Sequence, residues 1–293
     1  SSTELTVNYV GSGSRRTDVG GGYNTALTPG PGNPQSRALY PYAKSTYYDR
    51  SIGKADYEGL QVFFNRRFQS GFAYQISYTY SKSIDDGASD LYGNGTLIRD
   101  PYQYQNDRSI STFDLTHVLS VNAIYALPVG TGKHWQLSNA FLNYTLGNWQ
   151  VNTITTARSG TPYSITVSGD IPNTGNPSTH ETANLVGDPS LSNPSRQAWF
   201  NKAAFQIPAV YTFGSLGRDT FRSDPFWDID FSVFRQFPIM EKRRLEFRAE
   251  AFNIMNNVVY GVPVTSMTAS NFGQVTGLGN SPRTLQFGLK LIF

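Results

Sequence analysis

The chain has 293 residues, a net charge of +3, 14% aromatic residues, 15% charged residues and no cysteine. A charged fraction this far below the ~25% of soluble domains, beside many aromatic residues, suits a surface that meets both lipid and water. The lack of cysteine excludes disulfides and thiolate chemistry, and the small net charge gives no sign of a nucleic-acid partner. No apolar run approaches the ~18 residues of a membrane helix, so a membrane-spanning chain of this composition has to use strands.

Eight segments alternate apolar and polar residues with a period of two, which predicts β-strands with one apolar face. The first lies at the N-terminus, where Leu5, Val7 and Tyr9 share a face, and no signal-peptide pattern precedes it. We expect the chain to be cut from a longer protein. The other strands are predicted near residues 60–68, 72–80, 115–127, 149–158, 227–233, 245–251 and 285–293. Each is close to the ~10 residues that cross a bilayer at a tilt.

The connections between these strands alternate in length. Long ones are predicted at 11–53, 84–111, 159–226 and 257–282, short ones at 69–71 and 238–242, and an intermediate one at 128–147. Long extracellular loops and short periplasmic turns are typical of outer-membrane barrels. A soluble sandwich could show the alternation, but it has no reason to sort its loops in this way. The pattern places both termini on the periplasmic side, and a short helical turn is predicted at 196–205.

The last strand carries the strongest alternation and ends on an aromatic residue, as the closing strand of a barrel does. Its apolar row, which we expect to face lipid during membrane assembly, is Leu285, Phe287, Leu289, Leu291 and Phe293. The alternative is a C-terminal strand in a soluble sheet. The predicted fold is therefore all-β, an antiparallel transmembrane β-barrel portion of about eight long strands.

Charged residues lie on the opposite side of two neighbouring strands and are candidates for lining the lumen: Asp228, Asp230, Glu246, Arg248 and Glu250. They could meet a plug or a solute, but cross-strand ion pairing within a polar interior is the favoured interpretation.

Few other residues suggest chemistry. The three histidines show no metal-ligand spacing, and Asp85-Asp86 fits a turn cap better than a calcium site. No nucleophile motif is present, so we expect no enzyme activity, no metal and no cofactor. Among the loop aromatics, Tyr92, Tyr102 and Tyr104 could bind a sugar or siderophore or could pack the loops, and both interpretations stay open.

Several motifs are spread over most of the chain: residues 57–68 (YEGLQVFFNRRF), 78–86 (YTYSKSIDD), 199–205 (WFNKAAF), 213–218 (FGSLGR), 228–234 (DIDFSVF), 247–253 (FRAEAFN) and the terminal strand. Together they resemble the C-terminal barrel region of TonB-dependent outer-membrane receptors, of the Oar-like kind common in Acidobacteria. Such receptors have a barrel of about 22 strands around an N-terminal plug.

The resemblance implies that residues 1–293 are the C-terminal part of such a barrel in the cell outer membrane, with the plug domain not present in this chain. The implied partners are outer-membrane lipid, the rest of the barrel and plug from the same or another chain, TonB through the missing plug, and the barrel-assembly machinery. The implied function is uptake of a large solute, a siderophore, oligosaccharide or peptide. Two other hypotheses are a surface structural or adhesive protein anchored by a barrel, and a soluble glycan-binding β-protein.

Overall fold

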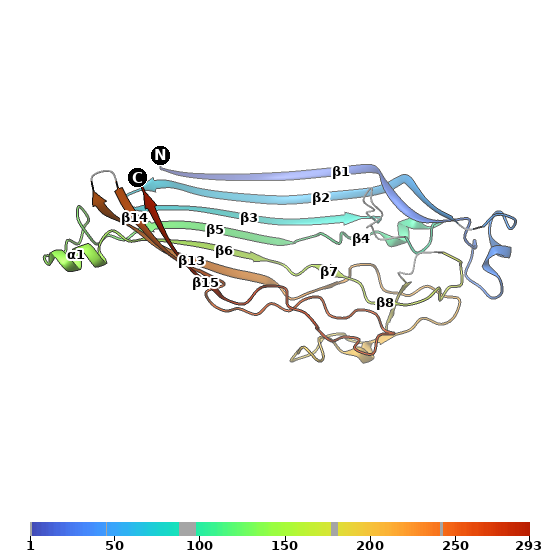
Figure 1. Ribbon diagram of the computed structural model, residues 1–293. Helices are drawn as coiled ribbons and strands as arrows, with labels where there is room; N and C mark the ends of the chain where they lie inside the picture. Colours follow the sequence, from blue (N-terminus) through green and yellow to red (C-terminus); the bar gives the residue numbers. More distant parts are fainter. Residues whose placement is uncertain (1, 45, 88–97, 177–180, 241–242) are drawn as a thin grey trace.

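The computed structural model describes residues 2–44, 46–87, 98–176, 181–240 and 243–293, and it is built around one antiparallel sheet (Figure 1). Eight long strands follow one another across this sheet in chain order, each paired with its neighbours. They are β1 (Thr3–Tyr23), β2 (Thr46–Gln69), β3 (Phe72–Asp85), β5 (His117–Ala126), β6 (Gln150–Arg158), β13 (Phe226–Met240), β14 (Arg243–Phe252) and β15 (Thr284–Ile292). The predicted all-β fold is confirmed.

Shorter elements lie in the connections. The helices are α1 (Ala140–Leu146) and the 3-10 helices η1 (Pro34–Arg37), η2 (Tyr104–Asp107) and η3 (Lys202–Ala204). The short strands are β4 (Ser109–Ile110), which extends the sheet beside β3, and β7 (Pro162–Tyr163), β8 (Thr166–Val167), β9 (Glu181–Thr182), β10 (Asn184–Leu185), β11 (Phe205–Gln206) and β12 (Phe221–Arg222). No described helix is long and apolar enough to cross a membrane.

The register gives the sheet one apolar face. Residues directly opposite each other in neighbouring strands point to the same side, so the pairing carries each row across the sheet. One such row is Leu5, Phe64, Ile76, Val121, Thr155 and Ile229, and at the other edge Phe247 lies opposite Leu289. We call this side the apolar face. The other side, the polar face, carries residues such as Asn65, Gln75 and Asn122, which also lie opposite one another.

The apolar face is exposed. Leu5, Val7, Leu285, Phe287 and Leu289 are each more than half accessible, although they are large apolar side chains. A contiguous apolar surface of this extent is rare on a protein surrounded by water, and it is the expected condition of a strand wall in contact with hydrocarbon.

The sheet is open. Among the described residues, β1 pairs only with β2 and β15 only with β14, so both outer strands have a free edge. Unpaired backbone groups at an edge have no partner in a bilayer, and they offer a template for further strands. The sheet therefore has the form of a barrel portion, as predicted, and not of a closed barrel.

The two ends of the sheet differ as predicted. The turn end carries both termini, the tight turn Ser70–Gly71 and the connection that contains α1 (Figure 1). Ser70 and Gly71 both have positive φ, which a two-residue hairpin turn needs. The loop end carries the long connections, which fold on one another beneath the outer halves of the strands.

Two sequence-based boundaries were wrong. About half of the loop predicted at 11–53 is strand, because β1 and β2 pair from Thr3–Arg66 to Tyr23–Thr46, with two register shifts between Arg15 and Asp18. This extension is rich in Gly and contains few large apolar residues, of which Val19 is buried at 1% exposure, so no period-two signal marks it. At the other terminus β15 ends at Ile292, which leaves Phe293 beyond the strand. The short helical turn predicted within 196–205 is η3, whereas α1 was not predicted.

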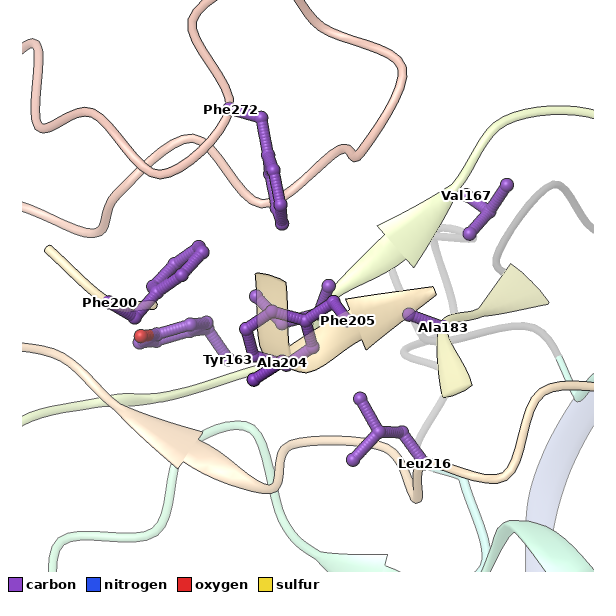
Figure 2. Close-up of a cluster of buried hydrophobic side chains, with 9 residues drawn as sticks. Tyr163, Val167, Ala183, Phe200, Ala204, Phe205, Leu216 and Phe272 are labelled. Atoms are coloured by element: carbon purple, nitrogen blue, oxygen red, sulfur yellow. The ribbon is translucent and has the colours of Figure 1, made fainter. Parts of the chain in front are cut away.

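The hydrophobic core lies in the loops and not in the sheet. Strands between lipid and a polar interior have no buried layer to share, whereas loops in water need one of their own. Segments 159–176, 181–225 and 253–283 supply it, with the rings of Phe200, Phe205 and Phe272 turned toward one another (Figure 2). The remaining buried members are Tyr163, Ile165, Val167, Ala183, Ala204 and Leu216. We call these segments, with 98–116, the loop cap.

We expect Leu289→Arg to block membrane assembly, because an arginine facing lipid near mid-membrane costs ~2–4 kcal/mol. Gln286→Arg is the matched control on the opposite face of the same strand and should assemble normally. Heat-modifiable gel mobility of the outer-membrane fraction measures the outcome. Equal assembly of the two variants would contradict the assignment of the faces.

Candidate functional site

The loop cap is fastened to the polar face at the outer end of β3. On this strand Ser81, Ser83 and Asp85 point to the polar face and are buried, while Tyr80 and Lys82, between them on the apolar face, are exposed. The main-chain N–H of Ser83 donates to the carboxylate of Asp114 at 2.6 Å, and the Ser83 and Ser111 hydroxyls are 2.9 Å apart. The cap therefore covers the side of the wall that faces away from lipid.

Arg218 joins cap and wall through buried ion pairs. Its guanidinium donates to Asp85 at 2.5 Å and to Asp219 at 2.9 Å, and its Nε donates to the main-chain carbonyl of Asp107 at 3.3 Å. All three ionised side chains of the two pairs are at most 6% exposed. Asp219 has a positive φ of 54°, and the Ser164 hydroxyl accepts its main-chain N–H. Non-glycine residues at such φ angles persist where the surroundings hold them.

Further arginine–aspartate pairs surround this centre. Arg99 pairs with Asp107 at 2.7 Å, Arg222 with Asp114 at 2.5 Å, and Arg108 with Asp86 at 2.9 Å. All three pairs lie in or beside the long connections, so they help to order loops that have little secondary structure.

These contacts decide how Asp85 and Asp86 are used. Asp85 accepts the N–H of Gly87 at 2.9 Å, which is the predicted turn cap, and both carboxylates are neutralised by arginine. No group of three or more histidine or acidic residues within the described part of the chain is arranged to hold a metal ion.

A cavity of about 240 Å³ lies in the cap, beside Arg218 and the apolar cluster. Its lining combines two paired arginine–aspartate sets with hydroxyls and one aromatic ring: Arg99, Asp107, Arg218, Asp219, Tyr163, Ser164, Thr166, Thr182, Thr265 and Val262. Because two arginines face two aspartates, the formal charge of the lining is zero. Such a lining offers hydrogen-bond donors and acceptors without a net field, and it suits a neutral polar group of about the size of one sugar ring or one amino-acid side chain.

Burial changes the acidity of groups in and near the cavity. It raises the pKa of Tyr163 to about 12, and it raises the pKa of Asp219 against the opposing effect of Arg218. Glu181, 2% exposed and adjacent to the lining residue Thr182, has its pKa raised to about 7 by burial, partly offset by Arg99. Its Oε2 has no hydrogen-bond partner among the described residues.

The predicted lumen residues lie on the polar face but away from this cavity. Glu246, Arg248 and Glu250 are neighbours along β14, with Arg248 donating to Glu246 at 2.9 Å and 3.9 Å from Glu250. On β13, Asp230 accepts the main-chain N–H of Asn253 at 3.0 Å, and Asp228 lies on the same face of this strand. The observed ion pairs run along one strand and not across two, and the lumen-lining role of these residues stays a prediction.

The predicted loop tyrosines do not line the cavity. Tyr102 donates its hydroxyl to the carbonyl of Thr25 at 3.0 Å, a loop-to-loop contact. Tyr104 begins η2, whose last residue, Asp107, does line the cavity, and Tyr92 lies outside the described residues.

Sequence reasoning missed the residues that form the site. Arg99, Arg218, Asp219 and Glu181 are scattered through loops without periodicity, so no spacing brings them together. The one available signal was the motif at 213–218, which ends on Arg218.

An open antiparallel wall with an exposed apolar face, short turns at one end and a polar loop cap at the other defines a β-barrel membrane protein. The chain belongs to the outer membrane beta barrel domain family, whose model matches residues 1–286. It is thus an outer-membrane protein, which excludes the soluble glycan-binding hypothesis.

None of the curated proteins compared with the chain matches it. The chain is similar to the outer membrane transporter YddB from Escherichia coli in its crystal structure, at 10% identity and a TM-score of 0.48. The similarity covers 99% of this chain and 30% of that chain.

We expect Arg218→Met to unfold the loop cap while the strands still assemble. The change leaves Asp85 and Asp219 buried without their partner, which typically costs about 3–5 kcal/mol. Hydrogen exchange of residues 181–225 measures the loss. Arg15→Met, which breaks the exposed pair between Arg15 and Asp56, is the matched control and should change little, because exposed pairs contribute little. Unchanged exchange in Arg218→Met would contradict the assigned role.

The raised pKa of Glu181 predicts that the cap becomes less stable as pH rises. Between the ordinary value of 4.5 and about 7, the unfolded carboxyl ionises while the folded one stays protonated. The contribution of Glu181 to stability is therefore fully present below pH 4.5 and falls by up to roughly 3 kcal/mol by pH 7. Glu181→Gln should remove this trend, whereas the control Glu58→Gln, at an exposed site on β2, should keep it. Hydrogen exchange corrected for its intrinsic pH dependence tests this, and parallel profiles for all three proteins would refute it.

Proposed function

We propose that the chain forms the barrel wall and extracellular loops of a TonB-dependent outer-membrane receptor of the Oar-like type. In this proposal it imports a large solute, such as a siderophore, an oligosaccharide or a peptide, and has no catalytic role. The remaining strands of the barrel pair with the free edges of β1 and β15, the plug fills the lumen and contacts TonB, and the barrel-assembly machinery recognises β15.

One observation carries the proposal. The cap is held on the polar face of the wall, where Asp85 binds Arg218, and it encloses a neutral, hydroxyl-lined cavity. An adhesive protein would be expected to display its loops away from the barrel. In contrast, loops that lie over the polar face place a recognition surface on the path that a solute takes through the barrel.

The chemistry of the cavity is consistent with capture of part of a larger solute. A volume of about 240 Å³ accommodates one ring or side chain of an oligosaccharide or peptide, and the rest would extend along the polar face. Because Arg99 and Arg218 are already paired with aspartates, a strongly charged group would have to displace an existing ion pair. Neutral polar groups avoid that cost.

Deletion of the complete gene tests the function. We expect loss of growth on one particular carbon, nitrogen or iron source at low concentration, restored by the complete gene and abolished by a protonophore that removes the energy supply of TonB. Normal uptake of every source tested, together with weaker attachment to surfaces, would refute import and favour the adhesive hypothesis.

Within the cavity, Thr166→Val with Thr265→Val should weaken binding of that solute about two- to tenfold for each hydroxyl that contacts it. The substitutions keep the shape of the side chains and remove only hydrogen-bonding capacity. Thr112→Val, at an exposed position outside the cavity, is the matched control. Equal affinities for all variants, measured by titration of the purified receptor, would place recognition elsewhere.

A further inference from the structure

The connection between β5 and β6, residues 127–149, is much longer than the Ser70–Gly71 turn at the same end of the sheet. It contains α1 and four aromatic residues, Trp135, Phe141, Tyr144 and Trp149, and its only charged residue apart from a histidine is Lys133. The nearest acidic residues along the chain are Asp114 and Asp170. A segment rich in aromatic residues and free of carboxylates is suited to the surface of a bilayer, where apolar acyl chains lie beneath anionic headgroups.

This segment contacts the apolar face of the wall. The ring of Tyr144 lies 5.7 Å from that of Phe237, and the ring of Trp149 lies 5.9 Å from that of Phe247, between centroids. Phe247 is opposite Leu289, in the row that faces lipid. The segment therefore folds toward the bilayer and not into the lumen.

Arg235 lies at the contact between residues 127–149 and the apolar face. It lies on the apolar face opposite Phe247, yet it is only 3% exposed. Its guanidinium carbon is 4.4 Å from the centroid of Phe237 and 5.7 Å from that of Tyr144. Its Nε and Nη1 have no hydrogen-bond partner among the described residues. A cation on a lipid-facing row is costly, and the two aromatic rings compensate for part of that cost.

The remainder of α1 is capped and exposes apolar side chains. The Asn139 side chain accepts the main-chain N–H groups of Phe141 and Leu142, which caps the helix, and Asn143 donates to the Thr131 hydroxyl at 2.7 Å. Phe141 is nevertheless 71% exposed in this chain, as exposed as the lipid-facing Phe287, and Leu142 and Leu146 are exposed as well. These side chains continue the apolar face past the end of the strands.

We infer that residues 127–149 form an interfacial anchor, in which α1 lies at the boundary between headgroups and acyl chains of the periplasm-facing leaflet. The occupant of its apolar surface is phospholipid. Continuity with the lipid-facing row argues for lipid over a protein partner, and the lack of carboxylates avoids repulsion from lipid phosphates. Aromatic and apolar side chains at this depth bind the interface by burying area in it. The inference does not depend on which solute the protein imports.

Site-directed labelling tests the anchor, and because residues 1–293 contain no cysteine, a single cysteine introduced there is the only labelled position within this part of the protein. The complete protein in nanodiscs of phosphatidylethanolamine and phosphatidylglycerol carries one fluorescent label at a time, in Phe141→Cys, Phe287→Cys or Ser192→Cys. We expect loss of iodide quenching at 141 and 287 relative to the exposed loop position 192. A spin label attached near the lipid headgroup should quench 141 more strongly than 287, and a deep acyl-chain spin label should do the reverse.

Two results would overturn the anchor. Iodide quenching at 141 equal to that at 192 would place α1 in water. A label at 141 protected from iodide and from both lipid spin labels would place it against protein. Adding Arg235→Gln to Phe141→Cys should restore iodide quenching at 141 without changing that at a separate label on 287, and unchanged quenching at 141 would refute the fastening role of Arg235.

Discussion

Backbone hydrogen bonding in hydrocarbon is the constraint from which the rest of this structure follows. A strand inside a bilayer has no water to satisfy its N–H and C=O groups, so every one of them has to find another strand. Pairing each strand with the next one in the chain meets this demand with the shortest connections at the turn end. The same demand leaves the edges of β1 and β15 as the two places where the wall is incomplete.

Because the wall has no buried apolar layer of its own, the loop end is stabilised by contacts among the loops. There the long connections form a separate apolar cluster around Phe200, Phe205 and Phe272, and arginine–aspartate pairs bind that cluster to the strand ends. Buried ion pairs contribute modest net free energy, but breaking one is expensive, so they specify one arrangement of loops over others. Ion pairs that fix one arrangement suit a recognition surface made of loops, because such a surface has little regular secondary structure to position it.

The sequence predicted the wall far better than the site, for a physical reason. A strand between lipid and a polar interior must alternate, so the rows around Leu289 and Phe64 were visible as patterns. The outer halves of β1 and β2 were missed because they are rich in Gly and contain too few apolar residues to show an alternation. Arg218 and its partners come from segments far apart in the chain, and pairing between loops leaves no periodic trace. Helix α1 is too short to show one.

The two ends of the wall solve the problem of a buried charge in opposite ways. At the loop end Arg218 is neutralised by the carboxylates of Asp85, on the polar face, and Asp219, in the loop cap. At the turn end Arg235 lies on the apolar face, where a carboxylate would itself have to be desolvated, and aromatic rings take the place of the anion. A cation held by rings keeps its attraction for phosphate, whereas one held by carboxylates does not. With carboxylates as partners, Arg218 is suited to ordering the loops. With aromatic rings as partners, Arg235 is suited to a position beside lipid.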